Sequence, residues 1–333
     1  MPLNTAVQLA PNILDPKKVE RIPLRAGFGE GLIQIADENP HVVGLCADLT
    51  GSTKMDAFAK KYPERFIQIG VAEQNLATVA SGLAKMGKIP YFSSYAMFSP
   101  GRNWEQIRTT ICYNDVHAIL VGSHAGISVG PDGATHQAIE DIAITRVIPN
   151  MSVIVPADAH EARKATMAVA GLSGGVYLRL AREKTPIMTM PETAFEIGKA
   201  YYIWQSAKEK PDVALIAAGP LLHNALLVAQ ELEQKGIGVT VVNNHTVKPL
   251  DNDTIIEAAK NAGAVVTIEE HQIAGGMGGA VAECLAAHYP VPMEFIGVRD
   301  RFGESGEPDE LLEHFGMGTH DIIKAVKKVL KRK

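Results

Sequence analysis

Apolar runs of strand length alternate with helical patterns along most of this chain. Runs such as 41–47 (HVVGLCA) and 117–122 (HAILVG) are almost continuously apolar, whereas a strand with one face in water alternates apolar and polar residues. Helical patterns such as 73–86 separate these runs. Because buried strands separated by helices are typical of a sheet covered on both faces, the sequence predicts an α/β protein with a doubly wound, mainly parallel sheet.

The same pattern divides the chain into two α/β units. In the first we expect strands at 41–47, 66–69, 89–94, 117–122, 151–155 and 176–180, and helices at 26–38, 53–61, 73–86, 103–113, 137–145 and 159–170. The rhythm breaks across 186–198, which carries two prolines and no clean period. It resumes with strands at 213–218, 239–243, 264–269 and 292–298, and helices at 221–234, 253–261, 278–288, 308–315 and 319–330.

The length of the chain fits this division, because 333 residues correspond to about two domains of ~100–200 residues each. We therefore expect an N-terminal extension at 1–20, a first domain at 21–188, a linker at 189–199 and a smaller α/β domain at 200–333.

Charge and cysteine content exclude several classes of protein. The net charge is −5, and binding to phosphate backbones requires a basic surface, so we expect neither a nucleic acid nor a membrane as partner. No run reaches the ~18 apolar residues of a membrane span. Three widely separated cysteines fit a reducing compartment. We expect a soluble, cytoplasmic protein.

One candidate site residue is Glu73, in the sequence IGVAEQN (69–75). A short strand leads here into a helix that begins with glutamate, and α/β proteins bind ligands where helices follow the carboxyl ends of parallel strands. A carboxylate in a first helical turn can also serve only to balance the helix dipole. The residues alone leave both interpretations open.

A second candidate is the loop that follows the apolar run 117–122. It contains His124, Asp132 and His136 among several glycines. Histidine moves protons near neutral pH, and both residue types bind hydroxyl groups. The alternative is a long loop whose polar side chains bond their own backbone. A metal site is not expected, because the spacing provides no clear third ligand.

A third candidate is a scattered set of basic and hydroxyl residues at the ends of apolar elements. It comprises Arg25, the segment 48–52 with Ser52, and the pair Arg179 and Arg182. A guanidinium group binds phosphate oxygens in pairs, and a serine hydroxyl can add a hydrogen bond. Each arginine taken alone is better explained by a surface ion pair.

Together these residues resemble a known family. The strings ADLTGS (47–52), IGVAEQN (69–75), SHAGISVGPDGATHQAIED (123–141), NHTVKPLD (244–251) and DRFGESG (300–306) resemble transketolase. The resemblance runs from about residue 25 to the end of the chain. It matches only the carboxyl-terminal half of a full-length transketolase, which consists of a pyrimidine-binding domain and a C-terminal domain.

The resemblance implies a thiamine diphosphate enzyme that transfers a two-carbon ketol unit from a ketose phosphate to an aldose phosphate. It implies that Glu73 bonds the aminopyrimidine ring of the cofactor and that His124 and His136 assist proton transfer. The remaining implied contacts are Tyr95, Phe98 and Arg102 with the cofactor, and Arg25, Ser52, Asp132 and Arg182 with the sugar phosphate.

The chain also departs from full-length transketolases. Those proteins hold the cofactor's diphosphate through a divalent metal such as Mg²⁺ with a GDG…N motif, and this sequence has no such motif. The resemblance therefore implies the C-terminal subunit of a split transketolase. The metal would lie on a separate N-terminal subunit, and two copies of each chain would form an α2β2 assembly.

Three other interpretations stay open. The β subunit of a 2-oxoacid dehydrogenase is also a separate chain of this length, but it lacks the DGATHQ loop. A deoxyxylulose-phosphate synthase shares that loop but is normally one longer chain that begins by decarboxylating pyruvate. A half-enzyme kept as an assembly or regulatory module is the non-enzyme alternative, and the intact set of Glu73, His124, Asp132 and His136 argues against it.

Overall fold

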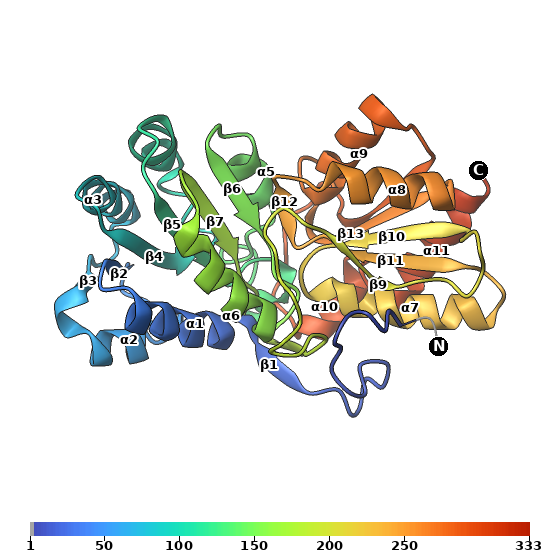
Figure 1. Cartoon of the computed structure of the whole chain (residues 1–333), viewed down its shortest axis with the longest axis horizontal. Helices are drawn as coiled ribbons and strands as arrows, with labels where there is room; N and C mark the ends of the chain where they lie inside the picture. The colour runs from blue at the N-terminus through green and yellow to red at the C-terminus, as the bar shows by residue number, and fades with distance from the viewer. Residues whose placement is uncertain (1–2) are drawn as a thin grey trace.

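The computed structural model describes residues 3–333, and its larger sheet has seven strands in the order β12-β6-β7-β5-β4-β2-β3 (Figure 1). The strands are β2 (Val42–Cys46), β3 (Phe66–Gln68), β4 (Ile89–Tyr95), β5 (Ala118–Ser123), β6 (Met151–Ile154), β7 (Gly175–Arg179) and β12 (Thr246–Lys248). All neighbouring pairs are parallel except β12 and β6. Strands β2, β5 and β7 are buried along their whole length, which explains their unbroken apolar runs.

Helices cover both faces of this sheet (Figure 1). They are α1 (Leu24–Glu38), α2 (Asp56–Lys61), α3 (Glu73–Lys85), α4 (Trp104–Gln106), α5 (Asp141–Arg146) and α6 (Ala159–Ala168), with the π-helical segment η2 (Ile107–Tyr113). Helices α1, α2 and α6 share one apolar core, and α3 and η2 contribute to another. Close packing of α1 on α6 requires glycine, because a Cβ at Gly27 would lie 1.9 Å from the carbonyl oxygen of Ala159.

The second sheet has five strands in the order β14-β13-β10-β11-β9. The strands are β9 (Tyr201–Trp204), β10 (Val213–Ala217), β11 (Val239–Asn243), β13 (Val265–Gln272) and β14 (Met293–Val298). The helices are α7 (Leu222–Gln234), α8 (Asn252–Ala262), α9 (Met277–His288), α10 (Pro308–His314) and α11 (Thr319–Leu330). Helices α7 and α11 pack on one face, and α8 and α9 pack on the other.

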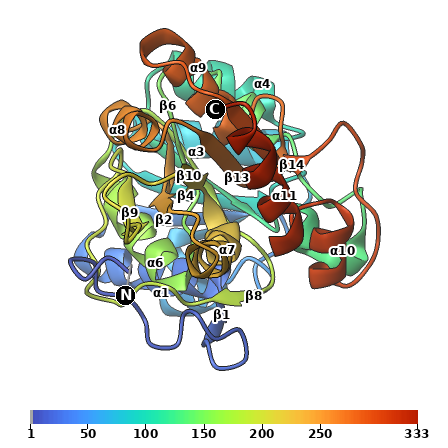
Figure 2. The same cartoon turned by 90° about the vertical axis from the view of Figure 1, so that its right-hand side faces the viewer.

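Short elements connect the two units. Strands β1 (Arg21–Pro23) and β8 (Lys184–Pro186) form a small antiparallel sheet. The segment before β1 bridges to the second unit, where Leu3 pairs with Trp204, so it passes from one unit to the other (Figure 1). Figure 2 views the molecule from the side of the second unit. The 3-10 turns are η1 (Pro63–Arg65), η3 (Ile127–Asp132), η4 (Val169–Gly171) and η5 (Gly219–Leu221). No helix between residues 3 and 333 is long and apolar enough to cross a membrane.

The expected α/β class and mainly parallel sheets are confirmed, and four local predictions need correction. The helix expected at 137–145 begins only at Asp141, because the residues before it make other contacts: Ala138 bridges Ala125, and Gln137 and Ile139 bond the second unit. The helix expected at 103–113 continues beyond Gln106 as a π-helix. The strand expected to end at 269 runs to Gln272.

The fourth correction concerns four strands that the pattern did not indicate, β1, β8, β9 and β12. All four are short and antiparallel to their partners. Strand β12 follows β11 along the chain but joins the sheet of the first unit. Such pairing depends on backbone hydrogen bonds between distant segments, which leave no hydrophobic period in the sequence.

Candidate active site

Glu73 begins α3, directly after the short strand β3 and its connecting turn. Its side chain is 4% exposed, and both carboxylate oxygens accept hydrogen bonds from Nη1 of Arg102, at 3.0 and 3.1 Å. The side chain of Arg102 is 50% exposed. Asn103 Nδ2 fixes the first turn of the helix by donating to the Glu73 carbonyl oxygen at 2.9 Å. A buried carboxylate thus lies at a helix N-terminus under a single half-exposed guanidinium group.

A row of contacts between a guanidinium group and four rings joins Glu73 to the histidines of the second candidate loop. The Arg102 guanidinium lies 4.2 Å from the centre of the Phe98 ring. The edge of His136 meets Phe98 at a centroid distance of 5.2 Å. Tyr95 stacks on His124 at 3.8 Å. The structure therefore brings together six residues that are separated along the sequence by up to 63 positions, counted from Glu73 to His136.

His124 is held in one orientation as β5 ends. It has a positive φ of 58°, and its Nδ1 lies 2.8 Å from the hydroxyl oxygen of Ser123. Burial lowers the pKa of His124 to about 3, and the positive charges of Arg25 and Arg182 add to this effect. The imidazole is therefore neutral at physiological pH and can both donate and accept a hydrogen bond. His136 is half-buried, with Nδ1 2.9 Å from the hydroxyl of Thr135.

Two arginines of the third candidate set lie beside these rings. Arg25 donates from Nη1 to the carbonyl oxygen of Ser52 at 2.7 Å, and its buried Nε has no hydrogen-bond partner among the described residues. Burial lowers the pKa of Arg25, as does the charge of Arg182. Arg182 donates to the Val129 carbonyl oxygen at 3.0 Å. Arg182 also pairs with the Glu183 carboxylate at 2.6 Å. Two guanidinium groups and this one carboxylate leave a net positive charge at this end of the site, and the unused N–H of Arg25 is available, which suits an anion.

Asp132 ends the η3 turn and is exposed. It belongs to the same loop as both histidines but makes no hydrogen bond or ion pair with another residue in 3–333 that would fix its side chain. Within the same range, no group of three or more His, Cys, Asp or Glu side chains could hold a metal ion.

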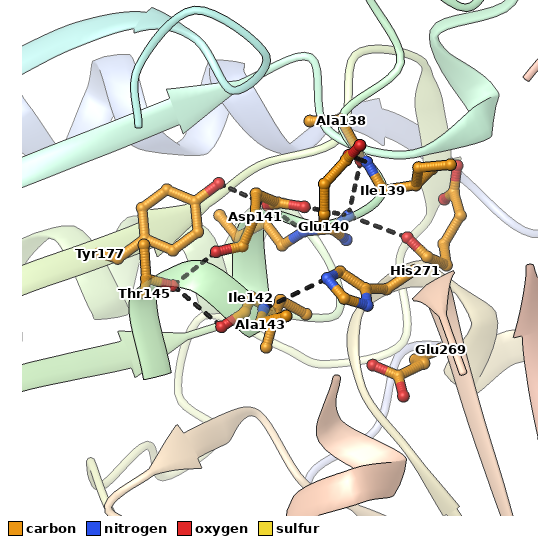
Figure 3. Close-up of polar contacts among 12 residues, drawn as sticks. Ala138, Ile139, Glu140, Asp141, Ile142, Ala143, Thr145, Tyr177, Glu269 and His271 are labelled. Atoms are coloured by element: carbon orange, nitrogen blue, oxygen red, sulfur yellow. Dashed lines mark hydrogen bonds and ion pairs between the residues drawn. The ribbon is translucent and has the colours of Figure 1, made fainter. Parts of the chain in front are cut away.

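Arg179, which the sequence grouped with the phosphate candidates, lies elsewhere. It is 5% exposed and donates from Nε to Asp141 at 2.6 Å, while Tyr177 donates its hydroxyl to the same carboxylate (Figure 3). Of the two interpretations of Arg179, the ion pair is the one that the structure supports, inside the protein rather than at its surface, so its charge is already neutralised.

Sequence reasoning also missed the buried acids at the end of β13, Glu269 and Glu270. The available signal was a pair of adjacent carboxylates after the apolar part of a strand. Buried acids need partners, so such a pair indicates polar contacts in the interior. Nothing in the sequence identified the partners, which lie more than 100 residues away for Glu270.

Comparison with known proteins identifies the family of this chain. The model of the transketolase pyrimidine-binding domain matches residues 20–188, and that of the transketolase C-terminal domain matches residues 204–322. This chain belongs to the transketolase family. Members of that family depend on thiamine diphosphate. The residues matched by the pyrimidine-binding domain include Glu73, Phe98 and both histidines.

Several transketolase relatives are similar over nearly their whole length. A protein of Methanocaldococcus jannaschii, named for the C-terminal section of a transketolase, is 42% identical over 93% of this chain and 96% of its own. A 6-deoxy-6-sulfo-D-fructose transketolase subunit of Clostridium sp. is 39% identical over 95% and 97%. A solved split gene transketolase, described as an inactive beta4 tetramer, is 44% identical with a TM-score of 0.86, covering 93% of this chain and 99% of its own.

Proposed function

We propose that this chain is the C-terminal subunit of a two-chain transketolase, which moves a two-carbon ketol unit from a ketose phosphate to an aldose phosphate. The observation that carries the proposal is the row from Glu73 through Phe98 to His136 and His124, beside two arginines. It provides an acid, a stacking surface, proton-transfer groups and an anion site in one place. We further propose that residues 189–199 link a domain at 21–188 to a domain at 200–333.

The residues around Glu73 fit the aminopyrimidine ring of thiamine diphosphate. Arg102 is a planar group with N–H donors, and it stacks on Phe98 while it donates to Glu73. An aminopyrimidine ring is also planar and carries N–H donors, so the same aromatic face and carboxylate can receive it. Because Arg102 is half exposed, it can move aside and line the edge of the ring, with Tyr95 beside Phe98.

When bound, thiamine diphosphate supplies the electron sink for cleavage of the carbon–carbon bond. Glu73 would hold a proton at the ring nitrogen that it faces. His124, neutral at physiological pH, would bond the sugar's carbonyl or hydroxyl oxygen, and His136 would move a proton at the neighbouring oxygen.

The basic end of the site would hold the far end of the sugar. Arg25 and Arg182 would bind the phosphate, with Ser52 beside Arg25 and Asp132 bonding a sugar hydroxyl. The Clostridium relative is named for a sulfonated sugar. Since a sulfonate is also a tetrahedral oxygen anion, a panel of sugars with either group is needed to find the physiological donor.

We also propose a separate N-terminal subunit that holds the cofactor's diphosphate through a divalent metal, in an α2β2 complex. This chain lacks the GDG…N motif for that task. The solved relative described as an inactive beta4 tetramer supports this view, because one type of subunit alone did not form an active enzyme there.

Reconstitution tests the proposal. The chain would be mixed with the candidate N-terminal subunit, thiamine diphosphate and Mg²⁺, and ketol transfer between phosphorylated sugars would be measured. We expect activity only from the mixture. Glu73→Gln should lower the rate at least about a hundredfold, because the carboxylate that holds the proton is lost.

The control is Glu64→Gln, which changes an exposed glutamate outside the site. Near-normal transfer by the Glu73→Gln mixture would contradict the role of Glu73. Consumption of pyruvate in place of ketose transfer would favour a deoxyxylulose-phosphate synthase-like reaction.

A further inference from the structure

The loop that carries both histidines rests on the carboxyl end of β13 in the second unit. The backbone N–H of Gln272 donates to the Ile139 carbonyl oxygen at 2.8 Å. Arg179 Nη2 donates to the Glu270 carbonyl oxygen at 2.9 Å, while its Nε binds Asp141. The carboxyl edge of a parallel sheet is where α/β proteins bind ligands. In this chain that edge of the second sheet holds the loop of the first unit.

Glu270 makes the most direct contact with that loop. Its side chain is 4% exposed, and its Oε1 accepts a hydrogen bond from the backbone N–H of Ser128. Ser128 lies in η3, between His124 and His136 in the sequence. Gly126 lies against the same oxygen, since a Cβ there would be 2.4 Å from Oε1, and its φ of +90° also favours glycine. The loop is therefore fitted closely to this one carboxylate.

A second contact holds the loop on the other side of Asp132. Gln137 Nε2 donates to the Glu304 carbonyl oxygen at 2.8 Å and to the Ile127 carbonyl oxygen at 3.1 Å. The segment with His136 and Asp132 thus lies between two points of attachment, Ser128 and Gln137. The attachment at Gln137 uses an uncharged amide, whereas the attachment at Ser128 depends on the buried acid Glu270.

The adjacent residue Glu269 provides a comparison within the same strand. Its two oxygens accept the backbone N–H groups of Met277 and Gly278, each at 2.7 Å, and so cap helix α9. Successive side chains of a strand point to opposite faces, and Figure 3 shows Glu269 apart from the contacts around Asp141. Two buried carboxylates on one strand therefore have different partners.

Burial of Glu270 is unfavourable for the fold by itself. Desolvation raises the pKa of this carboxyl group, while the Ser128 N–H and the charge of Arg179 lower it in part. An apolar side chain of similar volume at such a position is often neutral or stabilising. The acid at position 270 is therefore better explained by what it holds than by its contribution to stability.

We propose that Glu270 is a positioning residue, which fixes Ser128 and thereby sets the loop with His124, Asp132 and His136 in its sugar-binding geometry. The sugar-binding part rests on the proposed function, whereas the fixing of the loop does not. The proposal assigns to the second unit a direct part in shaping the site of the first.

Hydrogen–deuterium exchange on the full-length chain tests the fixing of the loop. Glu270→Met keeps the volume but removes the acceptor, and Glu270→Gln keeps an acceptor oxygen. We expect Glu270→Met to speed exchange in peptides covering 125–137 about tenfold, and Glu270→Gln to stay close to the parent chain. Glu269→Met should speed exchange at the start of α9 and leave 125–137 unchanged.

Two exchange outcomes overturn the proposal. One is unchanged exchange at 125–137 in Glu270→Met. The other is equal loosening of that segment by Glu269→Met, which indicates general destabilisation. If Glu270→Met does not fold, Glu270→Asp, which withdraws the acceptor by one methylene, replaces it with the same expected pattern in smaller measure.

Kinetics of the reconstituted complex test the consequence for the sugar. Glu270→Met should lower kcat for ketol transfer about tenfold. The affinity for thiamine diphosphate, measured by the change in circular dichroism when the cofactor binds, should stay unchanged. In Glu270→Gln, kcat should return close to that of the parent complex. An unchanged kcat with a loosened loop overturns the sugar-binding part. If the parent complex shows no ketol transfer, the proposed function fails, and the exchange result still decides whether Glu270 fixes the loop.

Discussion

At the scale of single residues, the site depends on titratable side chains that other side chains cover. Glu73 lies under Arg102, and His124 stacks on Tyr95 within the influence of the positive charges of Arg25 and Arg182. The carboxylate is satisfied by one half-exposed partner that a ligand can replace. The imidazole stays neutral because both burial and nearby positive charge oppose protonation. The chemistry at each position is therefore set by neighbours distant in sequence.

Replacing Arg182 by alanine should weaken binding of phosphorylated sugars more than it slows turnover. The guanidinium would contact the phosphate, far from the reacting carbon, so its loss should raise KM about tenfold or more with a smaller fall in kcat. Steady-state kinetics of the reconstituted enzyme would measure both, with exposed Lys184→Ala as control. A parent enzyme with equal kinetics on phosphorylated and unphosphorylated acceptors would contradict the assignment.

Acid should destabilise the isolated chain through His124. The folded pKa is about 3, against ~6.5 unfolded, so below pH 6.5 the unfolded state binds a proton that the folded state does not. Stability from this residue is complete above pH 6.5 and falls by up to ~2 kcal/mol between pH 6.5 and 5. Urea unfolding at both pH values should show a smaller loss for His124→Gln than for the parent chain.

The matched control is His320→Gln, at an exposed position of α11. Its pH dependence should follow that of the parent chain. If the free energy of unfolding fell equally between pH 6.5 and 5 in the parent chain and in His124→Gln, the unfolded state would gain no extra proton at this residue.

At the scale of elements, buried carboxylates lie at the N-termini of three helices. Glu73 begins α3, Glu269 caps α9, and Asp158 caps α6 by accepting the backbone N–H of Glu161 at 2.9 Å. Asp158 also accepts the backbone N–H groups of Met188 and Thr189, at 2.8 and 2.7 Å. One buried carboxylate therefore connects a helix of the first unit to the segment that leaves it.

Asp158→Ala should destabilise the chain by about 2–4 kcal/mol, because three buried backbone N–H groups lose their acceptor at once. Urea or thermal unfolding of the isolated chain measures the change. Asp253→Ala, at an exposed position in the first turn of α8, should change stability far less. A loss below ~1 kcal/mol for Asp158→Ala would mean that water or a rearranged side chain replaces the cap.

At the scale of the whole molecule, the two units share one apolar core and one polar interface. The core includes Leu45 and Leu120 of the first sheet together with Ala214 and Ile216 of the second. Strand β12, although it follows β11, extends the first sheet. The second unit therefore contributes a strand to the sheet of the first. Its strand β13 also contacts the loop of His124 and His136.

Much of the fold could be predicted from the chain, because local signals specify it. The apolar runs at β2, β5 and β7 are continuous, and the helical patterns at α3 and α7 are periodic, each over its own length. Strands β9 and β12 escaped prediction because an edge strand is defined by a distant partner. For the same reason Arg179 was grouped with the phosphate contacts, although its partner Asp141 is 38 residues away.

The sequence by itself determined the α/β class, the two units, the transketolase resemblance and the candidate residues Glu73, His124 and His136, because period and motif are written in neighbouring positions. Only the tertiary structure decided that Arg102 covers Glu73, that Tyr95 stacks on His124 and that Glu270 holds the loop. Those relations join residues far apart in the chain, and their energies depend on burial and distance, which exist only after folding.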